Sequence, residues 1–315
     1  LVSRIRGAVG ALDANEQSDA LLCLSRANAW VTEQQDSALA VQAWRELGAL
    51  RFDLAEDTIG AEEAFFVACA IEPEVGAYRY ASDLVDRLGA DEAFSIIVDR
   101  AVNVEEEGGD ATMVARLYVA AAHVAAAAGK DQLAVDTAVA AVRADSSRGD
   151  AVALVEKLAS GPEALAALDF VYETLASAAL GRYGYRAAHY RAARQLEKLG
   201  APADALRHAI AAFEAVPSVG ASYQMLLRLA ERAGDPGAAV SSLATGAANL
   251  PIDGQVAWLI RAADLARRIA VGGDVRLDLL LRAFATRPSV ALVLELESTA
   301  TDLMATARDG SHDML

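Results

Sequence analysis

The sequence predicts an all-α fold, an α-solenoid of about eight helix-turn-helix hairpins followed by a C-terminal capping helix. Three observations predict it: an alanine-dominated apolar composition, a recurring spacing of small residues, and glycines between the repeats. Hydrophobic residues make up 54% of the 315 residues and aromatic ones only 6%, which favours closely packed helices over a β-sandwich. No segment alternates polar and apolar residues for long enough to indicate a strand.

The repeat is a spacing of alanine, three residues, an apolar residue, two residues, a small residue, four residues and proline. It occurs at 205–217 and again 34 residues later at 239–251. Copies of varying quality begin at Ala20, Ala61, Ala93, Ala134, Ala164, Ala205, Ala239 and Arg276. Because the separations vary from 30 to 41 residues, the repeats are degenerate. Each copy marks the second helix of a hairpin.

Glycines separate the two helices of each predicted hairpin, because glycine just past a helix end readily adopts the left-handed conformation. These glycines are Gly60, Gly89, Gly129, Gly161, Gly200, Gly234 and the pair Gly272 and Gly273. Pro162, Pro202 and Pro236 follow three of them, and proline is tolerated in the first turn of a helix. Each unit is therefore predicted to be helix, tight turn and helix.

The elements follow from these signals in chain order. The first hairpin is predicted at 2–12 and 17–31, and a capping helix at 290–308. We expect the capping helix to cover the last open core through Val290, Val293, Leu294 and Leu296. We expect one domain over 1–315, comprising two hairpins (1–73), irregular hairpins (74–180), the most regular repeats (181–288), the capping helix (289–308) and a frayed tail (309–315).

The segment 186–251 resembles tandem tetratricopeptide (TPR) repeats through its 34-residue period. Trp44, Leu47 and Gly48 resemble the W-x2-L-G start of a TPR unit. The resemblance implies a right-handed superhelix whose concave surface, lined by the first helix of each hairpin, holds a peptide segment or a partner's helix. Small residues are then expected where paired helices approach closely, at Ala61, Ala68, Ala205, Ala212, Ala239 and Gly246. Large residues are expected to fill the spaces between hairpins, at Trp44, Phe65, Tyr118, Tyr223 and Leu243.

The charge excludes a general nucleic-acid binder, since 44 acidic against 28 basic residues give a net charge of −16. The charge is uneven, because residues 182–287 carry 14 basic and 9 acidic side chains. No apolar run is long enough for membrane insertion. Cys23 and Cys69 cannot form a disulfide framework, which favours the cytoplasm, and both are expected to be inert core residues. The start at Leu1, without methionine, indicates a trimmed segment.

The candidate binding site lies in the basic stretch. Arg186, Tyr190 and Arg194 are spaced to share one helix face, which the TPR resemblance turns toward the groove. The candidate residues are Arg186, Tyr190, Arg191, Arg194, Arg228 and Arg232, with Arg261 as a further extension. Guanidinium groups beside phenol rings suit a carboxylate, a phosphate or an acidic peptide. The alternative is that the tyrosines are packing residues and the arginines are solvated.

No residue pattern indicates catalysis, a cofactor or a metal ion. His123, His189, His208 and His312 are scattered, and His189 and His208 can approach across one hairpin but are too few for a metal site. The acidic segment 105–110 lacks the pattern of a calcium loop. Residues 272–274 lack the strand and lysine of a phosphate loop.

We therefore expect a non-enzymatic scaffold or adaptor that binds a protein or peptide partner. One alternative is a substrate-recognition or sensor segment of a larger multidomain enzyme whose catalytic domain lies outside this chain. Another is an α/α-barrel enzyme, which the open stacking of 34-residue units disfavours. Self-association is a further expectation, because an acidic first half and a more basic second half can stack head to tail.

Overall fold

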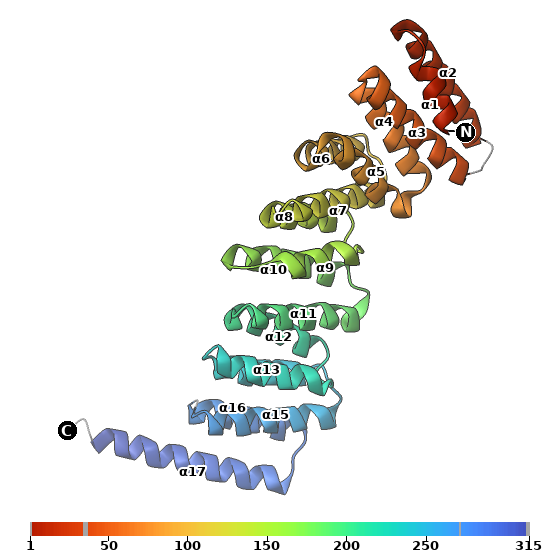
Figure 1. Ribbon diagram of the computed structural model, residues 1–315. Coiled ribbons are helices and arrows are strands. Elements are labelled where there is room, and N and C mark those ends of the chain that lie inside the picture. Colours follow the sequence, from red (N-terminus) through yellow and green to blue (C-terminus); the bar gives the residue numbers. More distant parts are fainter. Residues whose placement is uncertain (1, 34–36, 271, 313–315) are drawn as a thin grey trace. The chain divides into compact units, whose positions relative to one another are not determined.

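The computed structural model describes residues 2–33, 37–270 and 272–312, which form helices and, within these ranges, no strand (Figure 1). The helices are α1 (Val2–Gly10), α2 (Ala14–Glu33), α3 (Ser37–Ala55), α4 (Thr58–Ile71), α5 (Pro73–Leu88), α6 (Ala90–Glu106), α7 (Ala111–Ala127), α8 (Asp131–Ala144), α9 (Gly149–Leu158), α10 (Pro162–Ala178), α11 (Gly181–Lys198), α12 (Pro202–Ala215), α13 (Gly220–Arg232), α14 (Pro236–Ala247), α15 (Ile252–Arg268), α16 (Gly273–Thr286) and α17 (Val290–His312). The predicted all-α fold is confirmed.

The repeat pattern identifies the second helix of every predicted hairpin. All eight copies fall in even-numbered helices, from α2 to α16. The first hairpin, predicted at 2–12 and 17–31, is observed as α1 and α2. The predicted capping helix is α17, which packs on α16 and continues to His312; residues 313–315 of the expected tail lie outside the described part of the chain.

The chain divides into two compact units, Leu1–Ala159 and Ser160–Leu315, here called the N-terminal and C-terminal units. In the N-terminal unit the hairpins α3–α4, α5–α6 and α7–α8 stack in chain order, and α9 packs on α8. In the C-terminal unit α10 packs on α11, followed by the hairpins α11–α12, α13–α14 and α15–α16. Each unit is thus an α-solenoid in which consecutive hairpins bury one another's faces.

Small residues lie where helices approach each other closely, as predicted. Ala61, Ala68, Ala205, Ala212, Ala239 and Gly246 are all buried. A Cβ atom on Gly246 of α14 would lie 2.8 Å from the Phe213 ring of α12, so this glycine lies where two neighbouring hairpins meet and not, as expected, between the paired helices of one hairpin. In the N-terminal unit, a Cβ on Gly48 would lie 2.7 Å from Cδ1 of Phe65. A larger residue at either glycine would therefore push the two helices apart.

Large side chains fill the remaining space. Phe65 and Leu243 are fully enclosed, and Tyr118 is buried. Trp44 is half-buried against a cluster formed by Leu21, Leu47, Leu50 and Ala64, and its indole N–H donates a hydrogen bond to Oγ1 of Thr32 at 3.0 Å. Tyr223 packs edge to face on Trp258 with ring centroids 4.9 Å apart.

The predicted helix-ending glycines are mostly observed in the left-handed conformation. Positive φ angles are found at Gly89, Gly129, Gly161, Gly200 and Gly234. The prediction is wrong at Gly60, which lies in the first turn of α4, and at Gly272, which precedes α16 with φ −36°. In their place Glu56 (φ 53°) and Ala270 (φ 52°) adopt the left-handed conformation after α3 and α15.

The contacts of α17 differ from the expected ones. Val290, Val293 and Leu294 are exposed, whereas Leu292 and Thr299 are buried and Leu296 is half-buried. Residues 292, 296 and 299 recur at helical spacing, so the face that packs on α16 is rotated from the face predicted from the apolar residues. Glu295 accepts a hydrogen bond from the Arg276 guanidinium at 2.7 Å and ties α17 to α16.

The two cysteines have different surroundings. Cys69 is buried, and burial raises the pKa of its thiol to about 12, so the thiol stays protonated at neutral pH as expected for a core residue. Cys23 is exposed, so the prediction that it is a core residue is wrong. Leu21 and Leu24 carry the inward face of α2. No helix in the described ranges has both the length and the apolar character needed to span a membrane.

Replacing Ala212 by leucine should lower the free energy of unfolding by about 1–3 kcal/mol, because the added methyl groups have no space in the α11–α12 hairpin. Urea unfolding followed by circular dichroism measures the change. The matched control is Ala203→Leu on the exposed face of the same helix, with an expected change within about 0.5 kcal/mol. Equal losses in the two variants would contradict the close helix approach.

Replacing Glu56 by glycine should raise the free energy of unfolding by about 0.5 kcal/mol. Removing the left-handed penalty of about 1–2 kcal/mol outweighs the greater freedom of glycine in the unfolded chain, which costs about 0.5–1 kcal/mol. A glycine in place of exposed Glu63, inside α4, should lower the free energy of unfolding by about 1 kcal/mol. The opposite signs in one denaturation experiment test the conformation of Glu56.

Candidate interaction surface

The candidate residues on α11 lie along one side of that helix, as their spacing predicts. The guanidinium carbon of Arg186 lies 5.2 Å from the centre of the Tyr190 ring, one helical turn further on. Arg191 and Arg194 are exposed. Nothing within the described ranges pairs with Arg194, which leaves its charge open to a ligand.

Arg186 also connects α11 to α13. Its Nε donates a hydrogen bond of 2.9 Å to Oγ of Ser222, a buried residue at the start of α13. One guanidinium edge is therefore fixed by the next hairpin, while the plane of the group covers the Tyr190 ring. This two-sided support holds the Arg186 side chain in one orientation.

Arg228 and Arg232 of α13 share one carboxylate on α11. Arg228 donates two hydrogen bonds to Glu197, from Nε at 3.0 Å and from Nη2 at 2.8 Å, and Arg232 donates a third at 2.7 Å. The Glu197 side chain is 14% exposed, whereas each arginine side chain is 52% exposed. The hydrogen bond from Arg228, with a further contribution from Arg232, lowers the pKa of Glu197 below its ordinary value. Sequence analysis did not identify Glu197 as their partner.

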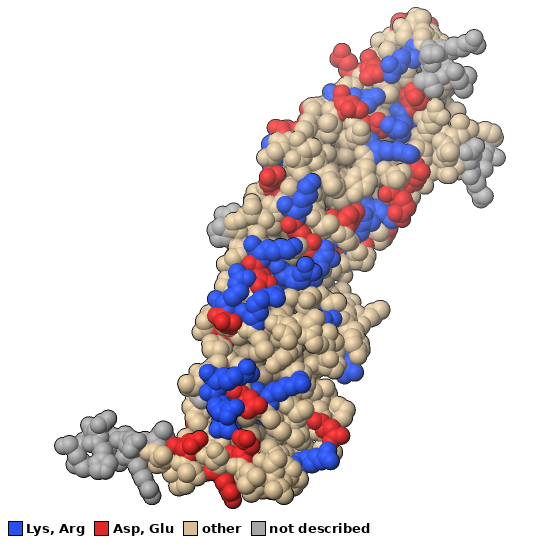
Figure 2. Space-filling view, turned by 60° about the horizontal axis from the view of Figure 1, so that its bottom comes forward, with Lys and Arg blue, Asp and Glu red and all other residues tan. Residues whose placement is uncertain are grey.

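Together these residues form a surface that we call the basic face: Arg186, Tyr190, Arg191, Arg194, Arg228 and Arg232. Glu197 is the acidic partner that the structure gives to Arg228 and Arg232, and it carries one negative charge. Figure 2 shows basic side chains gathered over much of the C-terminal unit, whereas acidic and basic side chains alternate over the N-terminal unit. The surface is thus locally positive in a chain of net charge −16.

Helix α15, the first helix of the α15–α16 hairpin, carries one more arginine near this surface. Arg261 is exposed, and its guanidinium carbon lies 4.5 Å from the Trp258 ring and 6.0 Å from the Tyr223 ring. Stacking on aromatic rings leaves the edges of the guanidinium free to donate hydrogen bonds. The arrangement repeats the arginine-on-ring pairing seen at Arg186 and Tyr190.

The N-terminal unit contains a cavity that sequence analysis missed. It has a volume of about 440 Å³, and α3 and α5 supply most of its lining. Arg45 donates two hydrogen bonds to the Asp83 carboxylate, at 2.7 and 2.8 Å. Arg79 pairs with Glu72 at its edge. Each of these two arginines has its own acidic partner, whereas Arg228 and Arg232 of the basic face share one, so the cavity is less suited to an anion.

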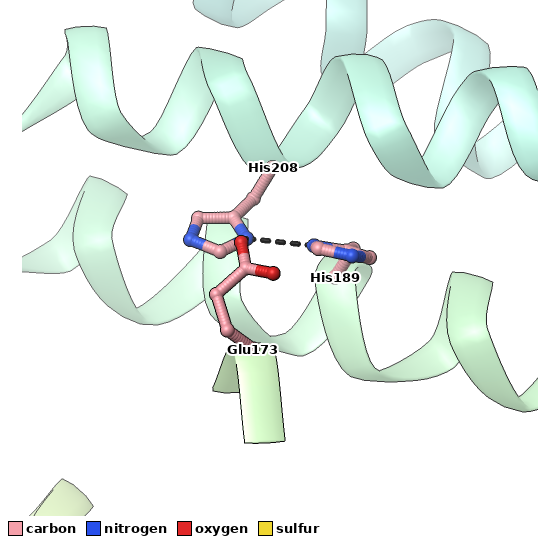
Figure 3. A group of neighbouring side chains, drawn as sticks. All are labelled: Glu173, His189 and His208. Carbon is pink, nitrogen blue, oxygen red and sulfur yellow. Dashed lines mark hydrogen bonds and ion pairs between the residues drawn. The ribbon is translucent and has the colours of Figure 1, made fainter. Parts of the chain in front are cut away.

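A buried histidine pair lies between α11 and α12, and its acidic neighbours on α10 were also missed. Nδ1 of His189 and Nδ1 of His208 are 2.8 Å apart, and Nε2 of His208 lies 2.8 Å from the Asp169 carboxylate. Glu173 approaches the same pair (Figure 3). The sequence predicts that the two histidines meet, but it carries no local signal that α10 turns two carboxylates toward them.

No protein-family model matches the sequence, and a comparison with curated proteins found no significant match. Several solved structures are similar. The TPR2AB domain of yeast Sti1 in its pHSP90 complex is 12% identical, with a TM-score of 0.27 over 85% of this chain and 99% of that one. The C-terminal part of a TPR repeat-containing protein from Cytophaga hutchinsonii is 13% identical, with a TM-score of 0.31 over 85% and 97%. Yeast Tom70 is 15% identical, with a TM-score of 0.27 over 93% and 61%.

These similarities concern the architecture alone, and TM-scores of 0.27 to 0.31 assign no role to any residue of this chain. The hairpins of the two units themselves show the α-solenoid fold. That fold resembles the helical repeats of TPR proteins.

Replacing Glu197 by glutamine should lower the free energy of unfolding by about 1 kcal/mol at neutral pH, because two arginines lose their charged acceptor. Because the pKa of Glu197 is lowered by folding, its contribution is present above the ordinary glutamate pKa of about 4.3 and is lost as the pH falls through the folded value. The difference between wild type and variant should therefore shrink in acid. The control is Glu231→Gln, which removes a carboxylate from an exposed position on α13.

Proposed function

We propose that the chain is a non-enzymatic protein-interaction scaffold, and that the basic face of its C-terminal unit binds an acidic peptide segment or the acidic face of a partner helix. The supporting observation is the arrangement on α11 and α13, where Arg228 and Arg232 share Glu197 while Arg194 has no partner in the described ranges. A free carboxylate at the end of a partner chain carries the same recognisable chemistry.

The geometry supports binding because the Arg186 side chain is held in place before a ligand arrives. Ser222 and the Tyr190 ring fix its orientation. Preorganised side chains lose little conformational entropy on binding. The planar guanidinium group can then donate two parallel hydrogen bonds to a carboxylate.

The positive charge of the basic face favours acidic partners. An acidic ligand gains from Arg194 and from the half-exposed edges of Arg228 and Arg232, whereas the net acidity of the chain repels it elsewhere. Attraction at exposed charges is screened by salt, so binding should weaken as ionic strength rises.

A peptide array tests the proposal. The full chain is incubated with peptides that vary in acidic content and that end in either a free or an amidated carboxyl group. We expect retention of acidic peptides and about tenfold or more weaker binding by the Arg186→Ala, Tyr190→Ala, Arg194→Ala triple variant. The control variant, Arg267→Ala with Arg268→Ala, removes the same number of charges from exposed positions on α15 and should bind as wild type does.

Two results would contradict the proposal: retention of neutral apolar peptides in preference to acidic ones, or equal binding by the triple variant and wild type with unchanged helix content. A second variant should change the affinity for acidic peptides in the opposite direction. Glu197→Gln removes the internal competitor for Arg228 and Arg232 and should therefore bind acidic peptides more tightly.

A further inference from the structure

The histidine pair occupies an unusual position in the repeat. His208 follows the first alanine of its copy by three residues. In the other copies this position holds Cys23, Ala64, Ile96, Thr137, Ala167, Ser242 and Leu279. His208 is 0% exposed and His189 is 2% exposed, so both imidazoles lie in the core of an alanine-rich hairpin. Helix packing alone does not need two buried imidazoles there.

The polar groups of the cluster converge on one point. The two Nδ1 atoms face each other at 2.8 Å, a distance that leaves room for one shared proton. Glu173 of α10 lies beside them, with Oε1 3.9 Å from Nδ1 of His208. One ligand atom from each of the three residues lies within 4.8 Å of the others (Figure 3).

Asp169 sets the orientation of His208. Its Oδ1 lies 2.8 Å from Nε2 of His208. The Arg207 guanidinium also donates a hydrogen bond to Oδ1 of Asp169, so this carboxylate is held between Arg207 and His208. A carboxylate accepts the Nε2 proton and thereby leaves the Nδ1 lone pair of neutral His208 directed at His189. Histidines that bind metals are commonly held by a carboxylate in this way.

His189 is suited to the same role. Its ring is 2% exposed, and its Nδ1 faces Nδ1 of His208 at 2.8 Å. Because His208 donates from Nε2 to Asp169, the proton of the Nδ1–Nδ1 hydrogen bond belongs to His189. On metal binding this proton would move to Nε2 of His189, which has no hydrogen-bond partner, and the Nδ1 lone pair would then face the metal.

We propose that Glu173, His189 and His208 bind a divalent transition-metal ion of the zinc type. A tetrahedral zinc ion with Zn–N distances of about 2.0–2.1 Å holds two nitrogen ligands about 3.3 Å apart. The two Nδ1 atoms, now 2.8 Å apart, would have to separate by about 0.5 Å, which small side-chain rotations supply. Two imidazoles and one carboxylate favour zinc over calcium or magnesium, which prefer oxygen ligands.

The cluster is accessible from one side. The Glu173 side chain is 45% exposed and that of Asp169 is 35% exposed, whereas the two rings are buried. Glu173 is also held by Arg207, whose Nη1 lies 3.3 Å from Oε1, and Arg207 pairs with Asp169 as well. Glu173 can therefore turn from Arg207 toward the histidines, and a water molecule from the exposed side can supply the fourth ligand.

The site would join three helices. Glu173 belongs to α10, His189 to α11 and His208 to α12. A bound metal ion would thus cross-link the first three helices of the C-terminal unit and stabilise them against unfolding. The proposal is independent of the basic face, since the two share no residue.

Isothermal titration of the metal-free full chain with zinc chloride tests the site. We expect one zinc ion per chain, a rise in melting temperature with zinc, and a visible absorption band when cobalt(II) is used instead. Glu173→Gln, a change on a half-exposed side chain, should weaken zinc binding at least tenfold and abolish the rise in melting temperature without changing helix content. Asp169→Asn should weaken binding about 10–100-fold through the orientation of His208.

The control is His123→Gln, which removes an exposed histidine from the N-terminal unit and should leave zinc binding unchanged. The proposal is overturned if wild type and Glu173→Gln bind zinc equally, or if His123→Gln causes the same loss as Glu173→Gln. Absence of any zinc binding by the folded wild-type chain would also overturn it.

Discussion

The close approach of paired helices is the constraint on which the rest of the structure depends. Paired helices can approach closely where one of the facing positions carries only a hydrogen atom or a methyl group, as at Gly48 of α3 beside Phe65 of α4. Each such contact leaves the outer faces of the hairpin apolar and uncovered, so the next hairpin must pack on it. The recurrence of small residues thus produces both the hairpin and the stack.

This framework decides which side chains are available for function. Because the alanines occupy the inner faces of the helices, the charged residues of α11 and α13 lie on an outer face, where Arg186 and Ser222 connect neighbouring hairpins. The histidine cluster arises in the opposite way, since His208 replaces a small or apolar residue on an inner face. Helix α11 therefore contributes to an exposed charged surface with α13 and to a buried polar cluster with α12.

The sequence predicts the parts of the fold that depend on local periodicity. The spacing of alanines identifies the second helix of each hairpin because three- and four-residue steps lie on one helix face. The expectation that the glycines between predicted helices end helices fails at Gly60, which lies in the first turn of α4. A Cβ atom there would collide with the Asp57 side chain that caps α4. The sequence also misses Glu197 and Glu173, because the rotation of neighbouring helices decides which residues meet across a hairpin junction. The candidate arginines were found from their spacing, but their partners required the structure.

Glu197 connects the electrostatics of the C-terminal unit to its mechanics. The carboxylate on α11 that neutralises Arg228 and Arg232 is also a tie between two consecutive hairpins. An anion that engages either arginine must compete with Glu197 and so loosens this joint. Anion occupancy at these arginines and the stiffness of the junction between α11 and α13 are then thermodynamically linked. By reciprocity, a force that separates the two hairpins increases the affinity for the anion.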